Sequence, residues 1–136
     1  LQRPVRKTKN ETPRREMVAA AIKRDGKYLM AKRPASGLLG GMWELPSGEV
    51  RNGETHHRAL TRELKQNFGL RIKPGKLVAS VQHAYSHFKV TLHVYACELV
   101  DGTPEAKEHD ETHWFARKSF SCLALPKVVH KFLDQL

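Results

Sequence analysis

Residues 48–70 contain the pattern that most constrains the fold, because they combine the start, the apolar face and the end of one helix. The segment from Asn52 to Thr55 can cap exposed backbone N–H groups, and Gly69 is the residue type that most often follows a helix in the left-handed conformation. Four apolar residues between them fall on one stripe: Ala59, Leu60, Leu64 and Phe68. The pattern predicts an amphipathic helix that begins near 52–55 and ends at Phe68.

This helix also carries one acid and two amides. Glu63, Gln66 and Asn67 share a face, because separations of three and four residues bring side chains together. Three carboxylates at such positions would hold Mg²⁺, which prefers hard oxygen ligands and lowers the pKa of an attacking water. Gln66 and Asn67 are neutral carboxamides, and a carboxamide cannot act as a general base. We therefore expect no metal site in this chain.

The order G-x5-E-x7-R-E-L-x-Q-N-x-G-L resembles the box of Nudix phosphohydrolases, in which two further acids occupy positions 66 and 67. The resemblance implies a Nudix-like fold, an α+β (α/β/α) sandwich in which helices flank a mixed β-sheet. It also implies a degenerate box without the usual hydrolytic chemistry. We expect structural roles for Glu54 and Arg62, and a pairing of Glu63 with Arg62 or a neighbouring lysine. The box consists of Gly48, Glu54, Arg62, Glu63, Gln66 and Asn67.

Hydrophobic periodicity places further elements on either side of the box. An apolar strand from Met17, an Asp25-Gly26 turn and residues 28–33 predict a hairpin. A Gly-rich loop is expected at 34–41. The pattern predicts strands at 76–82 and 88–99 and a short strand at 112–115. It predicts an amphipathic helix within 125–136, after Pro126. This order agrees with a sheet flanked by helices.

The chain of 136 residues fits one domain, and its formal net charge of +10 points to a polyanionic partner, nucleic acid first. We interpret residues 1–16 as a basic inter-domain linker and 17–136 as the globular domain, with further sequence expected upstream. No apolar run has the length of a membrane span, so we expect an intracellular chain with no membrane partner. With the basic charge, we expect it to be associated with DNA, and we expect a monomer. Cys97 and Cys122 show no disulfide or zinc spacing, and Cys97 is expected to be buried.

Two further stretches, R-P-A-S-G-L-L-G-G-M-W-E-L-P at 33–46 and H-A-Y-S-H-F at 83–88, narrow the resemblance. Together with the basic lead-in they resemble, over essentially the whole chain, the C-terminal Nudix-like domain of MutY-type adenine DNA glycosylases. Tyr85 stands where that family usually has Phe. The resemblance implies recognition of 8-oxoguanine opposite adenine, in base-excision repair, by a domain that is non-catalytic alone. It implies two partners: double-stranded DNA containing 8-oxoguanine:adenine, and an N-terminal glycosylase domain of the same polypeptide.

In that family the glycosylase domain flips and excises the adenine and carries a [4Fe-4S] cluster. Its signature parts are not in this sequence, and two cysteines cannot hold the cluster, so we expect no cofactor in this chain. Oxidation of guanine turns N7 into a donor and adds an acceptor at C8, and a serine hydroxyl can meet both. The resemblance therefore implies that Ser86 contacts the N7–H and O8 edge of the oxidised base and that Tyr85 packs beside the base. It implies that His87 orients the loop or contacts a phosphate.

Basic residues in the lead-in and near the two stretches are candidates for phosphate contacts, which make binding strongly salt-dependent. The candidates are Arg6, Lys7, Lys9, Lys32, Arg33 and Lys89. Two other functions stay open at this point. One is a free-standing Nudix hydrolase of oxidised nucleoside triphosphates with a degenerate metal site, and the other is a DNA- or RNA-binding module unrelated to repair.

Overall fold

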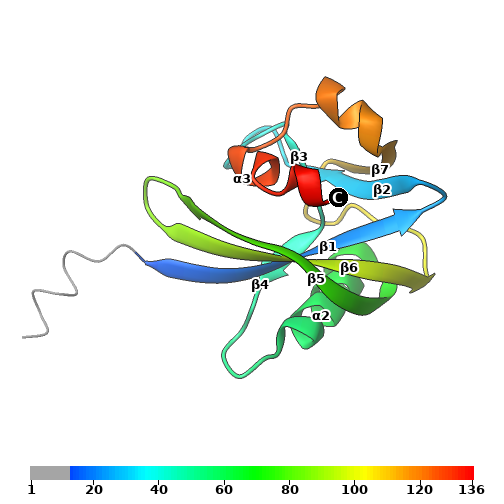
Figure 1. Ribbon diagram of the computed structural model, residues 1–136, viewed down its shortest axis with the longest axis horizontal. Coiled ribbons are helices and arrows are strands. Elements are labelled where there is room, and N and C mark those ends of the chain that lie inside the picture. The colour runs from blue at the N-terminus through cyan, green and yellow to red at the C-terminus, as the bar shows by residue number, and fades with distance from the viewer. Residues whose placement is uncertain (1–12) are drawn as a thin grey trace, which may run out of the picture.

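Strand β1 (Arg14–Arg24) is central to the sheet in the computed structural model, which describes residues 13–136 (Figure 1). Most of β1 pairs in parallel with β6 (Lys89–Asp101), from Arg14 opposite Lys89 to Ile22 opposite Cys97. Strand β6 in turn pairs antiparallel with β5 (Arg71–Ala84). Beyond Arg24 the chain reverses at Asp25 and Gly26, both at positive φ, into β2 (Lys27–Lys32). This mixed sheet confirms the predicted α+β class.

Shorter strands extend the sheet, and helices cover it. Strand β4 pairs with β1, whereas β3 and β7 pair with β2, so the strand order is β3-β2-β1-β6-β5 with β4 and β7 off this path. The strands are β3 (Trp43–Glu44), β4 (Ser47–Glu49) and β7 (Glu111–Ala116), and the helices are α2 (His56–Phe68), η1 (Arg117–Cys122), α3 (Lys127–His130) and η2 (Leu133–Gln135). No helix within 13–136 is long and apolar enough to cross a membrane.

The side chains of β1 alternate between two apolar cores. Val18, Ala20 and Ile22 face α2, whose buried face includes Leu64 and Phe68. Ala19 and Ala21 face the opposite way and pack in a cluster with residues of η1 and α3. Figure 1 shows α2 below the sheet and the C-terminal helices above it. The buried strand therefore separates two helical layers, as the sandwich prediction requires.

Most of the predicted elements are confirmed, with two corrections. Strand β1 begins at Arg14, so residues 14–16 belong to the sheet rather than to a linker that ends at 16. The ladder reaches this far because the backbone N–H of Lys89 donates to the carbonyl of Pro13 at 2.8 Å. The structure of residues 1–12, and with it the rest of the linker prediction, lies outside the described residues.

The C-terminal helix is shorter than predicted. Helix α3 contains only Lys127–His130, and a separate 3₁₀ turn, η2, follows it. Phe132 leaves the helical conformation, with φ −122° and ψ 4°, while its ring is buried in the core with Phe120 and Val129. Burial of this ring outweighs continuation of the helix, since an aromatic side chain contributes more on burial than one helical turn does.

The two cysteines behave as expected. Both are free, and Cys97 is buried among the side chains beneath α2. Burial raises the pKa of the Cys97 thiol to about 12, so the thiol stays protonated and acts as a small apolar group.

The α2 packing face makes a testable contribution to stability. Leu64 is fully buried, whereas the adjacent Lys65 is exposed. We expect Leu64→Ala to lower the free energy of unfolding by about 2–5 kcal/mol, because it removes buried methyl groups and leaves a cavity. Lys65→Ala is the matched control and should change it by no more than about 0.5 kcal/mol. Urea denaturation followed by circular dichroism measures both, and similar effects of the two changes would contradict the packing described.

Candidate functional site

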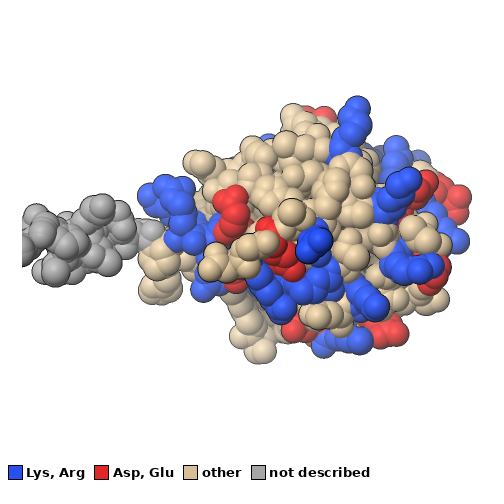
Figure 2. Space-filling view, turned by 90° about the horizontal axis from the view of Figure 1, so that it is seen from below, with Lys and Arg blue, Asp and Glu red and all other residues tan. Residues whose placement is uncertain are grey.

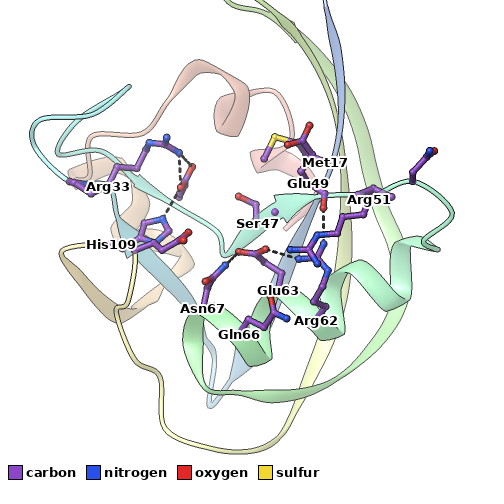
Figure 3. Close-up of a pocket in the computed structure, with 16 residues that line it drawn as sticks. Met17, Arg33, Ser47, Glu49, Arg51, Arg62, Glu63, Gln66, Asn67 and His109 are labelled. Carbon is purple, nitrogen blue, oxygen red and sulfur yellow. Dashed lines mark hydrogen bonds and ion pairs between the residues drawn. The ribbon is translucent and has the colours of Figure 1, made fainter.

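The box residues are held in place by the two ends of α2. Thr55 caps the helix, its hydroxyl accepting a hydrogen bond from the Arg58 N–H at 3.2 Å. At the other end Gly69 adopts the left-handed conformation, φ 66°, and its N–H bonds back to the last turn. Both ends agree with the sequence prediction. The buried stripe of α2 fixes its rotation on the sheet, which turns Glu63, Gln66 and Asn67 toward β4 and a cleft (Figure 3).

Glu63 is the one box acid of this face, and both of its carboxylate oxygens are engaged. Arg62 Nη1 lies 3.5 Å from Oε1, and the Asn67 side-chain N–H donates to Oε2. The side chain is almost buried against Gly48, where an added Cβ would lie 2.3 Å from Glu63 Oε1. Gly48 is therefore needed to make room for the carboxylate. The expected pairing of Glu63 with Arg62 is present.

Arg62 also closes the loop that precedes the helix. Its guanidinium donates to Glu54 at 2.7 and 3.0 Å and to the carbonyl of Glu49 at 2.8 Å, and Glu54 accepts a further bond from the N–H of Arg51 at 2.9 Å. The hydrogen bond from Arg62 and the one from Arg51 lower the pKa of the Glu54 carboxyl from 4.5 to about 2. These contacts agree with the structural roles expected for Glu54 and Arg62.

The cleft beside this helix face has a volume of about 700 Å³. The far wall of the cleft carries a second group of interacting polar side chains, which the sequence did not reveal. Arg33 pairs with Glu44 at 2.9 Å, and Glu44 lies 3.0 Å from His109 Nε2. Figure 3 shows Arg33 and His109 across the cleft from Glu63. The cleft is lined by Met17, Arg33, Pro34, Glu44, Ser47, Gly48, Glu49, Val50, Arg51, Asn52, Arg62, Glu63, Gln66, Asn67, Glu108 and His109.

This donor set does not fit the pair of Mg²⁺ ions that a Nudix box would hold. Gln66 and Asn67 bring no charge, the Glu63 oxygens are occupied by Arg62 and Asn67, and Glu44 is neutralised by Arg33. Only Glu49 and Glu108 line the cleft as exposed acids within residues 13–136. Mg²⁺ needs several hard oxygen ligands, and these two acids are too few to supply them for a pair of ions.

The predicted recognition residues lie in the turn between β5 and β6, outside the lining of this cleft. The backbone N–H of Tyr85 donates to the carbonyl of Phe88 at 2.8 Å and closes the turn. The Tyr85 ring is half-buried against Phe88 (centroids 5.0 Å apart) and His83 (4.7 Å), and this burial raises the pKa of its hydroxyl. Ser86 and His87 are exposed at the tip. The turn therefore presents a serine beside a fixed aromatic ring.

The two sequence stretches that carry the glycosylase resemblance meet in space. A second, smaller cavity of about 140 Å³ lies between the turn and the Gly-rich loop and is lined by Tyr85, Phe88, Leu38 and Leu39 among others. Leu39 holds a positive φ of 57°, and Leu38 is 51% exposed. An exposed apolar side chain beside an apolar cavity is a common feature of binding surfaces.

Basic side chains gather near the turn between β5 and β6. Arg14 is opposite Lys89 in the parallel ladder, and the guanidinium of Arg15 lies 4.3 Å from the centre of the Phe88 ring. Lys131 donates to the carbonyl of Gln82, and Lys131 and Lys127 both add to the lowering of the His83 pKa, whose first cause is burial. Seen from the α2 side, a basic group lies next to the start of the described chain (Figure 2).

The predicted phosphate contacts are distributed unevenly. Lys89 is at the turn, whereas Lys32 lies 3.8 Å from Glu111 and Arg33 is engaged by Glu44. The sequence did not single out Lys127 and Lys131, because the topology that brings α3 to β5 is not visible in it. Arg6, Lys7 and Lys9 lie outside the described residues.

Comparison with known proteins identifies the family. The family model described as the NUDIX domain matches residues 17–135. The chain belongs to the NUDIX domain family. It is 40% identical over 99 residues to a CTP pyrophosphohydrolase of Escherichia coli, covering 73% of each chain. It is 31% identical over 134 residues to an adenine DNA glycosylase of Rattus norvegicus, covering 93% of this chain and 26% of that protein.

A solved structure of a MutT protein from Methanosarcina mazei superposes with a TM-score of 0.83 at 25% identity, covering 92% of this chain and 94% of that one. The Nudix-like fold expected from the box spacing is therefore confirmed. The relatives of this NUDIX domain include both free-standing hydrolases and parts of DNA glycosylases, and the hydrolase match is higher in identity and closer in length.

The contact between Gly48 and Glu63 in this NUDIX domain can be tested by a double-mutant cycle. We expect Gly48→Ala to destabilise the fold by about 1–3 kcal/mol, because the new Cβ overlaps the Glu63 carboxylate. Glu63→Ala removes that carboxylate, so Gly48→Ala in this background should cost less, with a coupling free energy of about 0.5–3 kcal/mol by denaturation. Additive effects would contradict the close approach.

The depressed pKa of Glu54 predicts a pH dependence of stability. A carboxyl that titrates at about 2 in the folded NUDIX domain and near 4.5 when unfolded stabilises the fold fully above pH 4.5. This stabilisation is lost as the pH falls from 4.5 toward 2. We expect Glu54→Gln to lower stability at pH 7 and to show a weaker pH dependence across that window, measured by urea denaturation at each pH. Glu111→Gln, at an exposed acid, is the control and should keep the wild-type slope.

Proposed function

We propose that this NUDIX domain recognises 8-oxoguanine opposite adenine in double-stranded DNA, as the C-terminal part of an adenine DNA glycosylase, and does not hydrolyse nucleotides itself. The observation that carries the proposal is the state of the box: Glu63 is bonded on both oxygens by Arg62 and Asn67. Together with the amide of Gln66, this leaves the helix without a general base or a charged metal cradle.

The exposed turn between β5 and β6 supports the binding half of the proposal. Ser86 is at the tip, beside a Tyr85 ring already held by Phe88 and His83, so little side-chain freedom is lost when a base stacks there. The serine hydroxyl donates and accepts, which matches the N7–H and O8 edge of the oxidised base. His87, also exposed, is placed to reach a phosphate or to support the turn.

The charge around this turn supports DNA as the ligand. Basic side chains from β1, β6, α3 and the residue after α3 lie around it: Arg14, Arg15, Lys89, Lys127 and Lys131. Phosphate contacts of this kind position a protein on DNA without reading its sequence. The Ser86 hydroxyl would then distinguish 8-oxoguanine from guanine. The net charge of +10 favours the same class of ligand.

The extent of the glycosylase match also supports the proposal. It spans more of this chain than the hydrolase match does. This chain spans about a quarter of the length of the glycosylase relative, so the features of the whole protein beyond this domain are proposed as well. They are an N-terminal glycosylase domain with a [4Fe-4S] cluster in the same polypeptide, an intracellular, DNA-associated location and a monomeric state.

A free-standing nucleoside triphosphate hydrolase is the second candidate. The comparisons favour it, because the pyrophosphohydrolase relative has higher identity and a similar length. Glu49 and Glu108, the exposed acids of the cleft, are the groups on which such an activity would depend. The amides Gln66 and Asn67 argue against this function, because the helix has two fewer negative charges than a Nudix box with acids at both positions.

Pyrophosphate release separates the two candidates. The chain is incubated with Mg²⁺ and, in turn, with 8-oxo-dGTP and CTP, with the E. coli pyrophosphohydrolase as the active comparison. We expect no release above background. Turnover comparable with typical enzymes, about 1–1,000 per second, that is lost in Glu49→Gln or Glu108→Gln would establish the hydrolase instead.

Ser86→Ala tests the lesion assignment. We expect the unchanged chain to prefer an 8-oxoguanine:adenine duplex over a guanine:adenine duplex, measured by fluorescence anisotropy at fixed salt. The variant should lose about 1–3 kcal/mol of this preference, roughly 5- to 150-fold in the ratio of dissociation constants, because the lesion edge loses its partner. Ser121→Ala, at an exposed serine in η1, is the control. An unchanged ratio in Ser86→Ala contradicts the assignment.

A further inference from the structure

A cluster away from the cleft brings two histidines and one carboxylate together from three elements. Glu16 is on β1, His56 is the first residue of α2 and His93 is on β6. Val18 is opposite His93 in the parallel ladder, so Glu16, two residues before it, projects from the same α2-covered face of the sheet as His93. None of the three residues lines the cleft.

The three side chains offer ligand atoms that converge. Glu16 Oε1 lies 2.6 Å from His93 Nε2, and the His56 and His93 rings stack with centroids 4.4 Å apart. One ligand atom from each residue lies within 4.8 Å of the other two. Ligand atoms around a tetrahedral Zn²⁺ are about 3.4 Å apart, because each bond to the ion is about 2.0–2.1 Å long. Side-chain rotations that move the ligand atoms by roughly an ångström would bring these three to that spacing.

Each histidine is held through its other ring nitrogen by a hydroxyl. His56 Nδ1 lies 2.7 Å from the Tyr95 hydroxyl, and His93 Nδ1 lies 2.8 Å from Ser80 Oγ. Each hydroxyl oxygen can accept from a ring N–H. Metal-binding histidines commonly have this arrangement, because a partner on Nδ1 orients the ring and leaves the Nε2 lone pair for the metal.

An ion pair between His93 and Glu16 does not account for the whole cluster. Such a pair needs no second imidazole, yet the His56 ring stacks on His93 at a separation where two protonated rings repel. Two imidazoles and one carboxylate from three elements make a nitrogen and oxygen donor set suited to Zn²⁺ rather than Mg²⁺.

We propose that Glu16, His56 and His93 bind one Zn²⁺, with the fourth position open to solvent. Glu16 is exposed and the two histidines are partly buried, so water can reach the ion. The bound ion ties the first turn of α2 to β1 and β6, and it stabilises the folded state by mass action because the unfolded chain does not hold this geometry. The proposal does not depend on the function proposed above.

Zinc titration of the untagged chain tests the site. In a Cys122→Ser background, which removes the exposed thiol, competition with a chromophoric chelator should give one Zn²⁺ per chain. We expect His56→Asn and His93→Asn each to weaken binding by more than about 10-fold, and Ser80→Ala by roughly 10-fold through loss of the ring orientation. His130→Asn, at an exposed histidine of α3, is the matched control and should bind as the parent does.

A second measurement locates the ion if a ligand variant fails to fold. In the parent chain, Zn²⁺ should shift the imidazole proton resonances of His56 and His93 and leave those of His113 and His130 unchanged, while Zn²⁺ raises the unfolding temperature. Ser80→Ala keeps all three ligands and should need about 10-fold more Zn²⁺ for the same shifts. The proposal is overturned if no one-to-one binding occurs, or if His56→Asn or Ser80→Ala binds Zn²⁺ as tightly as His130→Asn.

Discussion

The parallel pairing of β1 with β6 is the interaction on which the rest of the structure depends. It joins nine consecutive residues of β1 to a strand more than seventy positions later in the chain, and both faces of β1 are buried as a result. One face receives α2, and the other receives the C-terminal helices. Because parallel strands start at the same edge, the ladder also sets the start of β1 beside the β5–β6 turn. The basic residues Arg14 and Arg15 reach the turn only through this register.

The charge arrangement inside the cleft depends on the amides that α2 carries at positions 66 and 67. In this chain, the carboxylates that face the cleft most closely are each matched by a cation or a donor: Glu63 by Arg62 and Asn67, and Glu44 by Arg33. A buried carboxylate without a metal needs such partners, since an unpaired charge in a low-dielectric site is costly. Asn67 therefore acts as an internal donor to Glu63, and a carboxylate at position 67 could not donate in this way.

Local features of the sequence predicted local features of the fold. The Thr55 cap, the Gly69 terminus and the Asp25-Gly26 reversal depend on neighbouring residues and were found in place. The contact of Glu44 with His109 joins residues 65 positions apart, and no periodicity in the sequence reports it. The same holds for Lys127 and Lys131 beside the turn, and for the end of α3, where burial of Phe132 overrides a helical pattern. Long-range packing decides these features, and single-sequence patterns do not contain it.

High identity to hydrolases and a degenerate box are compatible on physical grounds. The fold of this chain depends most on the residues of the two cores, such as Val18, Leu64 and Phe68, where loss of volume costs several kcal/mol. Gln66 is exposed and Asn67 is only partly buried, so substitution there costs the fold little. Identity summed over the chain is therefore weighted toward packing, whereas the chemistry depends on a few unburied positions. The identity to the pyrophosphohydrolase therefore reports a shared scaffold and does not by itself assign an activity to this chain.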